Sequence, residues 1–336
     1  AETSTDIYYA CSNGIVNYDL EDNSVNMLTV TNGMSDLGIS AIGSDGETVM
    51  VGYENGNLDI IEGNTITNVS WIKIAEVSGD KTIHAFEFDG DLIYISTGIG
   101  LVVFDNANKE IKDTYYPYTN PVIYDAAVHQ DTLYVGTDDG IYLAHKDKAF
   151  LNDKNQWTKK SDLPFYLINA DISRMESFGD KLLFAYEDND NFNSDSLYYI
   201  QDNVFNAYSE NPLSITNIKA YSDELILSLA YSVNFLDADL VQKDLFYVMP
   251  EIGAPNPTAC VRNDEFYWVS DERGGLVQVR RTNLFDAQSL FSNSPWTDGS
   301  YRMDIQYGKV LVAGGGLTHN LQNNYFRNGV YLFEDE

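Results

Sequence analysis

The sequence predicts an all-β protein, a seven-bladed β-propeller built from four-stranded antiparallel blades. Three observations support this fold. A phrase of two apolar stretches around a tight glycine turn recurs about every 40–45 residues, a short strand with a polar turn precedes most copies, and no amphipathic helix stands out. A period in this range, with four strands in each unit, is typical of a propeller blade. An eight-bladed ring remains an alternative.

The recurring phrase is a strand, a turn rich in glycine or acidic residues, and a second strand. The first of its two strands is nearly continuous in apolar residues, which is typical of strands covered on both faces. The clear copies occupy residues 7–19, 49–61, 93–105 and 133–144, and the weaker copies occupy residues 182–200, 225–238, 267–279 and 310–333.

A shorter strand with a polar turn comes before all copies but the first. Asp and Gly tolerate the backbone dihedrals of such hairpin turns. A more polar fourth strand, as in residues 25–32 and 64–72, ends the unit. The sequence has eight hairpins but only seven preceding strands, because no strand precedes the first hairpin. This count predicts one propeller over residues 1–336, whose ring is closed by strands from both ends of the chain. The preceding strands and their turns occupy residues 39–46, 85–91, 126–131, 174–180, 218–223, 259–264 and 303–308.

The formal net charge of −31 restricts the partners. Nucleic acid requires a basic surface, so it is excluded as a partner, and adsorption to an anionic membrane by charge is disfavoured. An anionic small ligand would need a local basic pocket. Cys11 and Cys260 lie in strand-like stretches and are expected to be buried core residues. No apolar run is long enough to cross a membrane.

Motifs for catalysis and metal binding are missing from the sequence. The four histidines show no metal-ligand spacing, and no nucleophile elbow or nucleotide-binding loop occurs in a suitable setting. Residues 188–193 begin like a calcium loop, but Phe192 and Asn193 stand where an oxygen ligand and Gly are needed. We therefore expect no catalytic residue, no metal, no cofactor and no enzyme. A carboxylate pair of a propeller glycosidase cannot be selected among 51 acidic residues.

Aromatic residues in the connections between blades are the remaining candidates for ligand binding. Flat rings suit sugars and peptide anchors, although they can equally plug the ring or cover blade edges. The candidates are Tyr116, Tyr118, Tyr166 and Trp296 in or near the crossing loops, and Trp157 in the lysine-rich linker 145–169.

Residues 31–105 carry a more specific pattern than a generic blade. The stretch NGMSDLGIS (residues 32–40) resembles the linker of two-component-regulator propeller repeats. The runs YENGNLDII, GDKTI and STGIGLVVFD look more closely like the amino-terminal propeller of the PorZ-like proteins of type IX secretion. This resemblance covers residues 7–145. Beyond them the sequence keeps only the regular spacing of propeller repeats.

The resemblance implies the first of two propellers in a longer protein that also has a sorting domain. It implies a non-enzymatic binding or scaffold role, with the protein exported to the periplasm or the outer-membrane surface. A surface complex with a sortase-like protein, and lipopolysaccharide or an oligosaccharide as ligand, are the implied partners, with lipopolysaccharide attached to secreted cargo. The alternative is a periplasmic propeller that senses polysaccharide for a hybrid two-component system.

Overall fold

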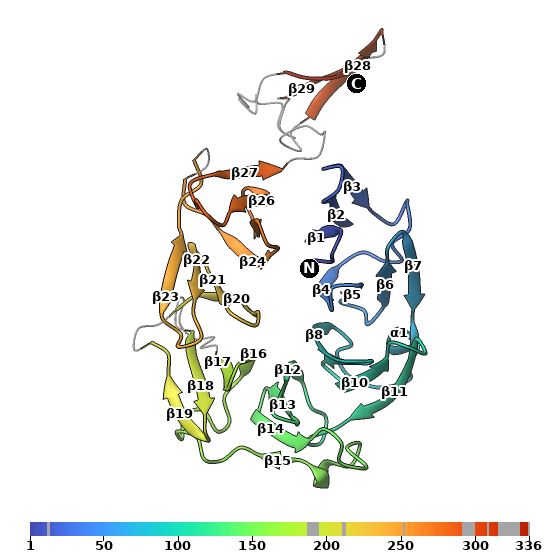
Figure 1. Ribbon diagram of the computed structural model, residues 1–336. Coiled ribbons are helices and arrows are strands. Elements are labelled where there is room, and N and C mark those ends of the chain that lie inside the picture. Colours follow the sequence, from blue (N-terminus) through green and yellow to red (C-terminus); the bar gives the residue numbers. More distant parts are fainter. Residues whose placement is uncertain are drawn as a thin grey trace, which may run out of the picture. The chain divides into compact units, whose positions relative to one another are not determined.

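The computed structural model describes residues 1–11, 14–186, 195–209, 213–250, 253–290, 300–307, 309–314 and 330–334. The chain divides into two compact units, Ala1–Leu290 and Phe291–Glu336. In the first unit, seven antiparallel sheets surround a common centre (Figure 1). We number these sheets as blades 1 to 7 in chain order. The all-β propeller predicted from the sequence is confirmed.

Six of the seven blades have four strands, and blade 1 has three. In the four-stranded blades the first strand of each sheet lies innermost, and consecutive strands pair as neighbours. The strands are β1 (Asp6–Cys11), β2 (Gly14–Asp19) and β3 (Val25–Leu28) in blade 1; β4 (Ile39–Ser44), β5 (Thr48–Tyr53), β6 (Leu58–Glu62) and β7 (Thr65–Val69) in blade 2; β8 (Ile83–Asp89), β9 (Leu92–Thr97), β10 (Gly100–Asp105) and β11 (Glu110–Tyr115) in blade 3; β12 (Ile123–His129), β13 (Thr132–Thr137), β14 (Gly140–His145) and β15 (Thr158–Lys159) in blade 4; β16 (Ile172–Phe178), β17 (Lys181–Tyr186), β18 (Ser196–Gln201) and β19 (Val204–Ala207) in blade 5; β20 (Ile215–Ala220), β21 (Leu225–Leu229), β22 (Ser232–Leu236) and β23 (Gln242–Phe246) in blade 6; and β24 (Pro257–Arg262), β25 (Phe266–Asp271), β26 (Gly275–Arg280) and β27 (Ala287–Leu290) in blade 7.

The second strand of each four-stranded blade packs closely against the next blade. In β5 every residue is buried, as the continuous apolar pattern predicts. Glycines allow the closest approaches. A Cβ on Gly52 would lie 2.5 Å from Cγ2 of Ile83 in blade 3, and one on Gly136 would lie 2.6 Å from the carbonyl oxygen of Ile172 in blade 5. These two glycines, which lie within the second strands β5 and β13, are therefore required for the packing of neighbouring blades.

A threonine fixes the turn between the second and third strands in blades 3 and 4. Thr97 Oγ1 donates to the carbonyl oxygen of Gly100 at 2.6 Å and accepts from the N–H of Ile99 at 3.2 Å. Thr137 makes the same two contacts in blade 4, with Gly140 at 2.8 Å and Asp139 at 3.0 Å. The repeated sequence thus produces a repeated turn.

Seven hydrophobic clusters hold the blades together, one at each interface between neighbouring blades. The cluster between blades 7 and 1 contains Ile7, Tyr18, Trp268 and Leu276. The rings of Tyr18 and Trp268 lie 4.9 Å apart, centroid to centroid. Residues near the two ends of the first unit therefore meet. Each fully buried aliphatic or aromatic side chain stabilises the fold by about 1.5–3 kcal/mol.

Blade 1 differs from the expectation for ring closure. We expected a carboxy-terminal strand to complete it, but the described residues of the second unit pair among themselves. There β28 (Ser300–Gln306), β29 (Lys309–Gly314) and β30 (Val330–Glu334) form one sheet. The inner edge of β1 instead receives Ala1, whose carbonyl oxygen accepts from the N–H of Tyr8 at 2.9 Å.

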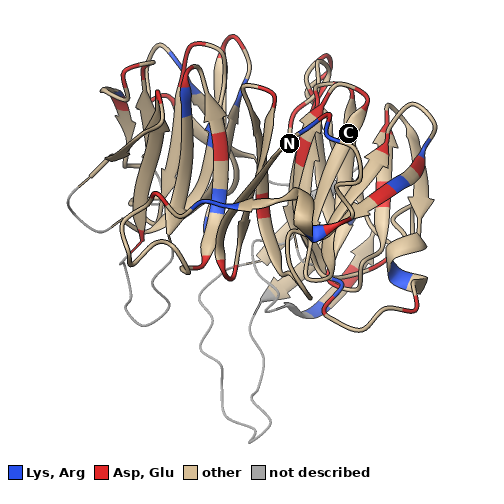
Figure 2. Cartoon of the chain, turned by 90° about the horizontal axis from the view of Figure 1, so that it is seen from below, with Lys and Arg blue, Asp and Glu red and all other residues tan. Residues whose placement is uncertain are grey.

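Helices are short in the described part of the chain. One α-helical turn, α1 (Trp71–Ile74), and one 3₁₀ turn, η1 (Lys154–Gln156), lie in connections. None of the described helices is long and apolar enough to span a membrane. Figure 2 shows Asp and Glu in many of the turns that join the strands.

Candidate functional site

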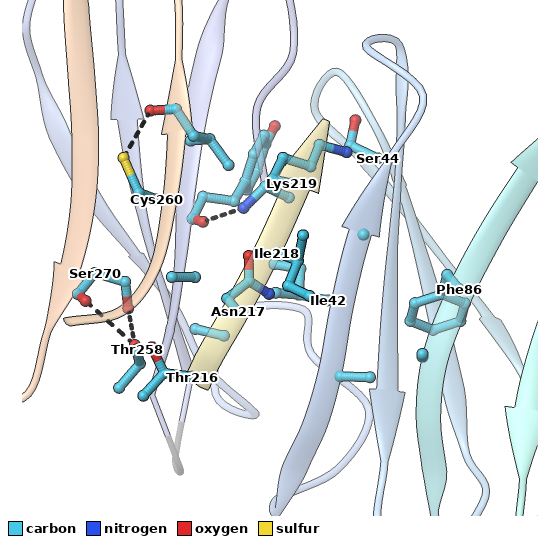
Figure 3. A pocket seen from close by; sticks show the side chains of 18 of the residues that line it. Ile42, Ser44, Phe86, Thr216, Asn217, Ile218, Lys219, Thr258, Cys260 and Ser270 are labelled. Carbon is cyan, nitrogen blue, oxygen red and sulfur yellow. Dashed lines mark hydrogen bonds between the residues drawn. The ribbon is translucent and has the colours of Figure 1, made fainter. Parts of the chain in front are cut away.

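The inner strands surround a cavity of about 550 Å³ at the centre of the first unit. Residues of β1 and of the first strands of blades 2 to 7 line it. Figure 3 shows Asn217 and Lys219 of β20 in the cavity wall, with Ile42 and Ser44 of β4 across from them. A central cavity lined by several repeats is the default binding site of a propeller, because every blade can add a side chain to it.

Each inner strand of blades 2 to 7 has a β-bulge at its second residue. The pairing register shifts there in all six strands, for example between Ile83 and Ala85 and between Ile172 and Arg174. A bulge re-aims the side chain of the extra residue and is common at rims and binding sites. The six bulge residues are all polar: Ser40, His84, Tyr124, Ser173, Thr216 and Thr258. They therefore lie at the end of the central cavity where each inner strand begins.

Carboxylates in the middle of the inner strands connect successive blades. Glu87 Oε1 in blade 3 accepts from the N–H of Val128 in blade 4 at 2.7 Å. Asp125 Oδ2 in blade 4 accepts from the N–H of Met175 in blade 5 at 2.9 Å. Glu176 in blade 5 accepts from the backbone of Ala220, which ends the inner strand of blade 6. An inner strand has an unpaired edge, and these side chains satisfy N–H groups on that edge.

Burial controls the protonation of these carboxyl groups. Desolvation, the largest cause, raises the pKa of Glu87 to about 7, of Asp125 to about 6 and of Glu176 to about 8. Each of the three has a nearby positive charge that opposes the rise, Lys219 for the two glutamates and Arg174 for Asp125. Near neutral pH, Asp125 is therefore mostly ionised, Glu87 is about half ionised and Glu176 is mostly protonated.

The opposite side of the cavity is formed by blades 7 and 1 and is less charged. Thr258 and Ser270 share a hydrogen bond of 2.5 Å between their hydroxyl oxygens (Figure 3). The backbone nitrogen of Ala1 donates to the carbonyl oxygen of Tyr8 at 3.0 Å. Cys260 is buried as expected, Cys11 is half-buried, and both are free thiols.

Of the aromatic residues selected from the sequence, the four that the structure describes do not line this cavity. Tyr116 is exposed, and Tyr118 stacks on Tyr142 at 5.0 Å and donates its hydroxyl to Asp138. Tyr166 is 58% exposed and meets Tyr198 through the two hydroxyl groups, 3.4 Å apart. Trp296 lies outside the described residues.

Trp157 has a structural environment that argues against ligand binding. Its side chain is buried in the core between blades 3 and 4, and its indole N–H donates to the carbonyl oxygen of Leu151 at 2.8 Å. The indole ring of Trp157, which belongs to the linker 145–169, therefore covers a blade interface. Covering blade edges is the second role that the sequence left open for these aromatic residues.

The sequence analysis selected none of the polar residues of the inner strands, and His84 was considered only as a metal ligand. A signal was present. An isoleucine opens each inner strand of blades 2 to 6, and a polar residue follows it every time. Aligning the strands on that isoleucine would have placed the bulge residues in one ring. The calcium-like segment 188–193 lies outside the described residues, and within those that are described no group of three or more His, Cys, Asp or Glu could hold a metal ion.

Comparison with known proteins agrees with this architecture. A search of curated protein sequences found no match. The structure is similar to that of PorZ from Porphyromonas gingivalis, described as an essential bacterial surface component of the type IX secretion system, with a TM-score of 0.72 and 18% identity. The match covers 99% of this chain and 43% of PorZ, so the chain spans less than half of that protein.

A computationally designed protein, Ika8, matches over 100% of this chain and 95% of its own length, with 8% identity and a TM-score of 0.56. At such identities both likenesses show the fold alone. In sequence, residues 7–158, just under half of the chain, match the model described as the PorZ N-terminal β-propeller domain of type IX secretion. The resemblance inferred from residues 7–145 is therefore confirmed, and blades 1 to 4 of this chain carry the signature of the PorZ amino-terminal propeller.

Proposed function

We propose that this chain is a non-catalytic binding propeller that serves type IX secretion at the bacterial surface. The observation that carries the proposal is the family match over residues 7–158, which includes blades 1 to 4 almost completely. The likeness in fold to PorZ, a surface component of that system, supports it. A rigid ring with a lined central cavity is a platform for binding, as such rings are in other propellers.

The finer role follows from the same resemblance. In this proposal the propeller is exported to the periplasm or the outer-membrane surface and works there in a complex with a sortase-like protein. The complex attaches lipopolysaccharide to secreted cargo, and this chain contributes docking rather than chemistry. The inner-strand carboxylates fit a non-catalytic role, because Glu87 and Asp125 are already engaged with backbone N–H groups of the next blade.

The net charge of −31 shapes how such a propeller can bind. A strongly anionic polysaccharide is repelled by the whole molecule, and the repulsion weakens as salt screens it. Docking to a protein partner carries no such penalty. We therefore expect the protein partner to bind more tightly than lipopolysaccharide at low ionic strength, with the difference shrinking as salt is raised.

Co-purification from outer membranes tests the proposal. The purified chain, immobilised, is incubated with detergent-solubilised outer membranes of a bacterium that uses type IX secretion, and captured proteins are identified by mass spectrometry. The expected result is recovery of the sortase-like component. Membranes from a strain that lacks the type IX system are the control. Recovery of no type IX component, in a preparation where the propeller is folded, would overturn the proposal.

Calorimetry with lipopolysaccharide at two salt concentrations then tests the ligand. Binding of lipopolysaccharide that strengthens with salt would assign the ligand to this propeller. Turnover of any polysaccharide, lost on substitution of one inner-strand carboxylate, would contradict the non-catalytic role.

A further inference from the structure

A second, smaller cavity lies beside the ring of bulge residues, on the side of blades 2 to 5. Its volume is about 250 Å³, below the roughly 300–1,000 Å³ of pockets for drug-sized ligands. Its polar lining consists of Ser40, Thr82, His84, Tyr124, Ser173 and Arg174. Four of these six are bulge residues, so the shared register shift is what turns these side chains toward one place.

The charge of this lining is unusual for the molecule. The chain has 51 acidic residues and 20 basic ones, yet the cavity is lined by one arginine and one histidine and by no carboxylate. This is the local basic pocket that an anionic ligand would need in a protein of charge −31. Because the surrounding field opposes anions, the ligand that fits is small and carries a single negative charge.

Arg174 is held in place but has an unused donor. Its Nη2 donates to the carbonyl oxygen of Thr216 at 3.1 Å, and its Nη1 lies 3.4 Å from the carbonyl oxygen of Ser173. Its Nε is buried and has no hydrogen-bond partner. In the described part of the chain this guanidinium takes part in no ion pair. A buried donor on a charged group without an acceptor is costly, and a carboxylate is the group that matches it.

His84 supplies a second unused polar atom. Its Nε2 is buried without a partner, and its ring meets that of Tyr124 edge-on at 5.7 Å. Burial lowers the pKa of His84, so the imidazole is neutral near neutral pH and offers either an N–H or a lone pair. Next to the pocket, Thr216 Oγ1 is a third buried atom without a partner.

Two carboxylates act on the pocket from outside its lining. Asp80 lies near His84, but its Oδ1 accepts from the N–H and the hydroxyl of Thr82 at 3.0 and 2.7 Å. Asp125 lies near Arg174, and its two oxygens accept from the backbone of Ala126 and Met175, each at 2.9 Å. Neither carboxylate forms a hydrogen bond with the Nε of Arg174, which has no partner.

We propose that this cavity, formed by the bulge residues of blades 2 to 5, binds a small molecule with one carboxylate and neighbouring hydroxyl groups. The carboxylate lies against Arg174 and His84. The hydroxyl of Ser173 contacts the rest of the ligand, together with the hydroxyl oxygen of Ser40, whose proton is donated to the carbonyl oxygen of Ile83 at 2.7 Å. Sugar acids and small hydroxy acids share this chemistry. The site does not depend on the secretion role, so either proposal can fail without the other.

The test is a titration of the purified whole chain with glucuronate, acetate and glucose, followed by calorimetry and by NMR of the histidine ring protons. The four histidines give few signals, and the variant His84→Gln assigns the one of interest. We expect glucuronate to bind with a Kd in the millimolar range and to shift the His84 signal. Acetate is expected to bind more weakly and glucose not at all, which separates a sugar acid from a bare carboxylate.

The variant Arg174→Met is expected to weaken glucuronate binding about tenfold or more. Arg273→Met, which removes an arginine from a turn of blade 7, is the matched control and should bind as the native chain does. If Arg174→Met does not fold, His84→Phe replaces it, because it fills the same space without the polar nitrogen. Failure of both acids to shift the His84 signal, equal binding of glucose, or unchanged binding by a folded Arg174→Met or His84→Phe variant would each overturn the proposal.

Discussion

Every blade interface has an apolar cluster, and the interfaces on one side of the central cavity add hydrogen bonds from inner-strand carboxylates. From blade 3 to blade 6, carboxylates of the inner strands accept from backbone N–H groups of the next blade, as Glu87 and Asp125 do. Between blades 7 and 1 an apolar cluster around Trp268 makes the contact. The first set is directional and fixes one blade against the next. The second depends on burial and joins segments far apart in the sequence.

This difference follows from chain connectivity. Neighbouring blades along the chain are joined by short crossing loops, so one hydrogen bond suffices to set their register. Blades 7 and 1 have no such link, and bringing residues 7–18 to residues 268–276 requires closing a very long loop. Non-directional burial of large side chains is what can offset that loss of entropy. The following predictions test this division, from the largest expected effect to the smallest.

Removing the Trp268 side chain from the apolar cluster between blades 7 and 1 should lower the free energy of unfolding the most. Trp268 is 1% exposed, and Trp268→Ala is expected to lower the free energy of unfolding by about 3–5 kcal/mol. Its indole nitrogen is buried without a partner, so Trp268→Phe should cost distinctly less. Denaturant unfolding followed by circular dichroism measures both. Equal losses in the two variants would show that the volume of the ring does not close the propeller.

Removing the ion pairs of Arg262 should cause the second-largest loss of stability. This arginine of blade 7 donates to Glu224 at 2.7 Å and to Asp223, both in the hairpin turn of blade 6, and Glu224 is buried. Arg262→Met leaves the Glu224 carboxylate underpaired, and we expect a loss of about 2–4 kcal/mol. Arg280→Met is the matched control. Its two ion pairs are more exposed, so this substitution should destabilise the fold far less than Arg262→Met does. A control as damaging as Arg262→Met would contradict the reasoning.

The carboxylates should make stability depend on pH. Burial raises the pKa of Glu87 to about 7, above its ordinary value, so the folded chain holds this proton more tightly than the unfolded chain. Its contribution is full below the ordinary pKa and is lost as pH rises toward 7. Glu87→Gln keeps an acceptor for Val128 without the titration. Relative to the native chain, it should gain about 1–2 kcal/mol between pH 5 and pH 8. A difference that is constant over this range would contradict the assignment.

The exposed aromatic residues of the crossing loops should contribute least to stability. Tyr166 is 58% exposed and has one weak hydroxyl contact with Tyr198. Tyr166→Ala is therefore expected to change the free energy of unfolding by less than about 0.5 kcal/mol. The buried Trp157 provides the contrast, since Trp157→Ala should lose several kcal/mol at a neighbouring position in the same linker. Equal effects of the two would show that exposure does not separate their roles.

The hairpins and their turns could be predicted from the sequence because each depends on neighbouring residues. The glycine turn after Thr97 and the apolar run of β5 are local features, and the structure has both. The site could not be predicted in the same way. Arg174 and His84 lie in different blades, and only the closed ring and the shared bulge bring them to one cavity. For Trp157 the sequence left two roles open, ligand binding or covering a blade edge, and the side chain is buried in the core between blades 3 and 4.

The cross-blade contacts of the inner strands run in one direction along the chain. Glu87, Asp125 and Glu176 each supply an acceptor, and the N–H always belongs to the following blade. A backbone N–H is present whatever the sequence of that blade. When a gene duplicates a segment with such a carboxylate, as blades 3 to 5 have, the copy therefore brings an acceptor for the backbone of the blade that follows it. Recombination within such genes can change the blade number and diversify the outer strands while the inner ring stays joined.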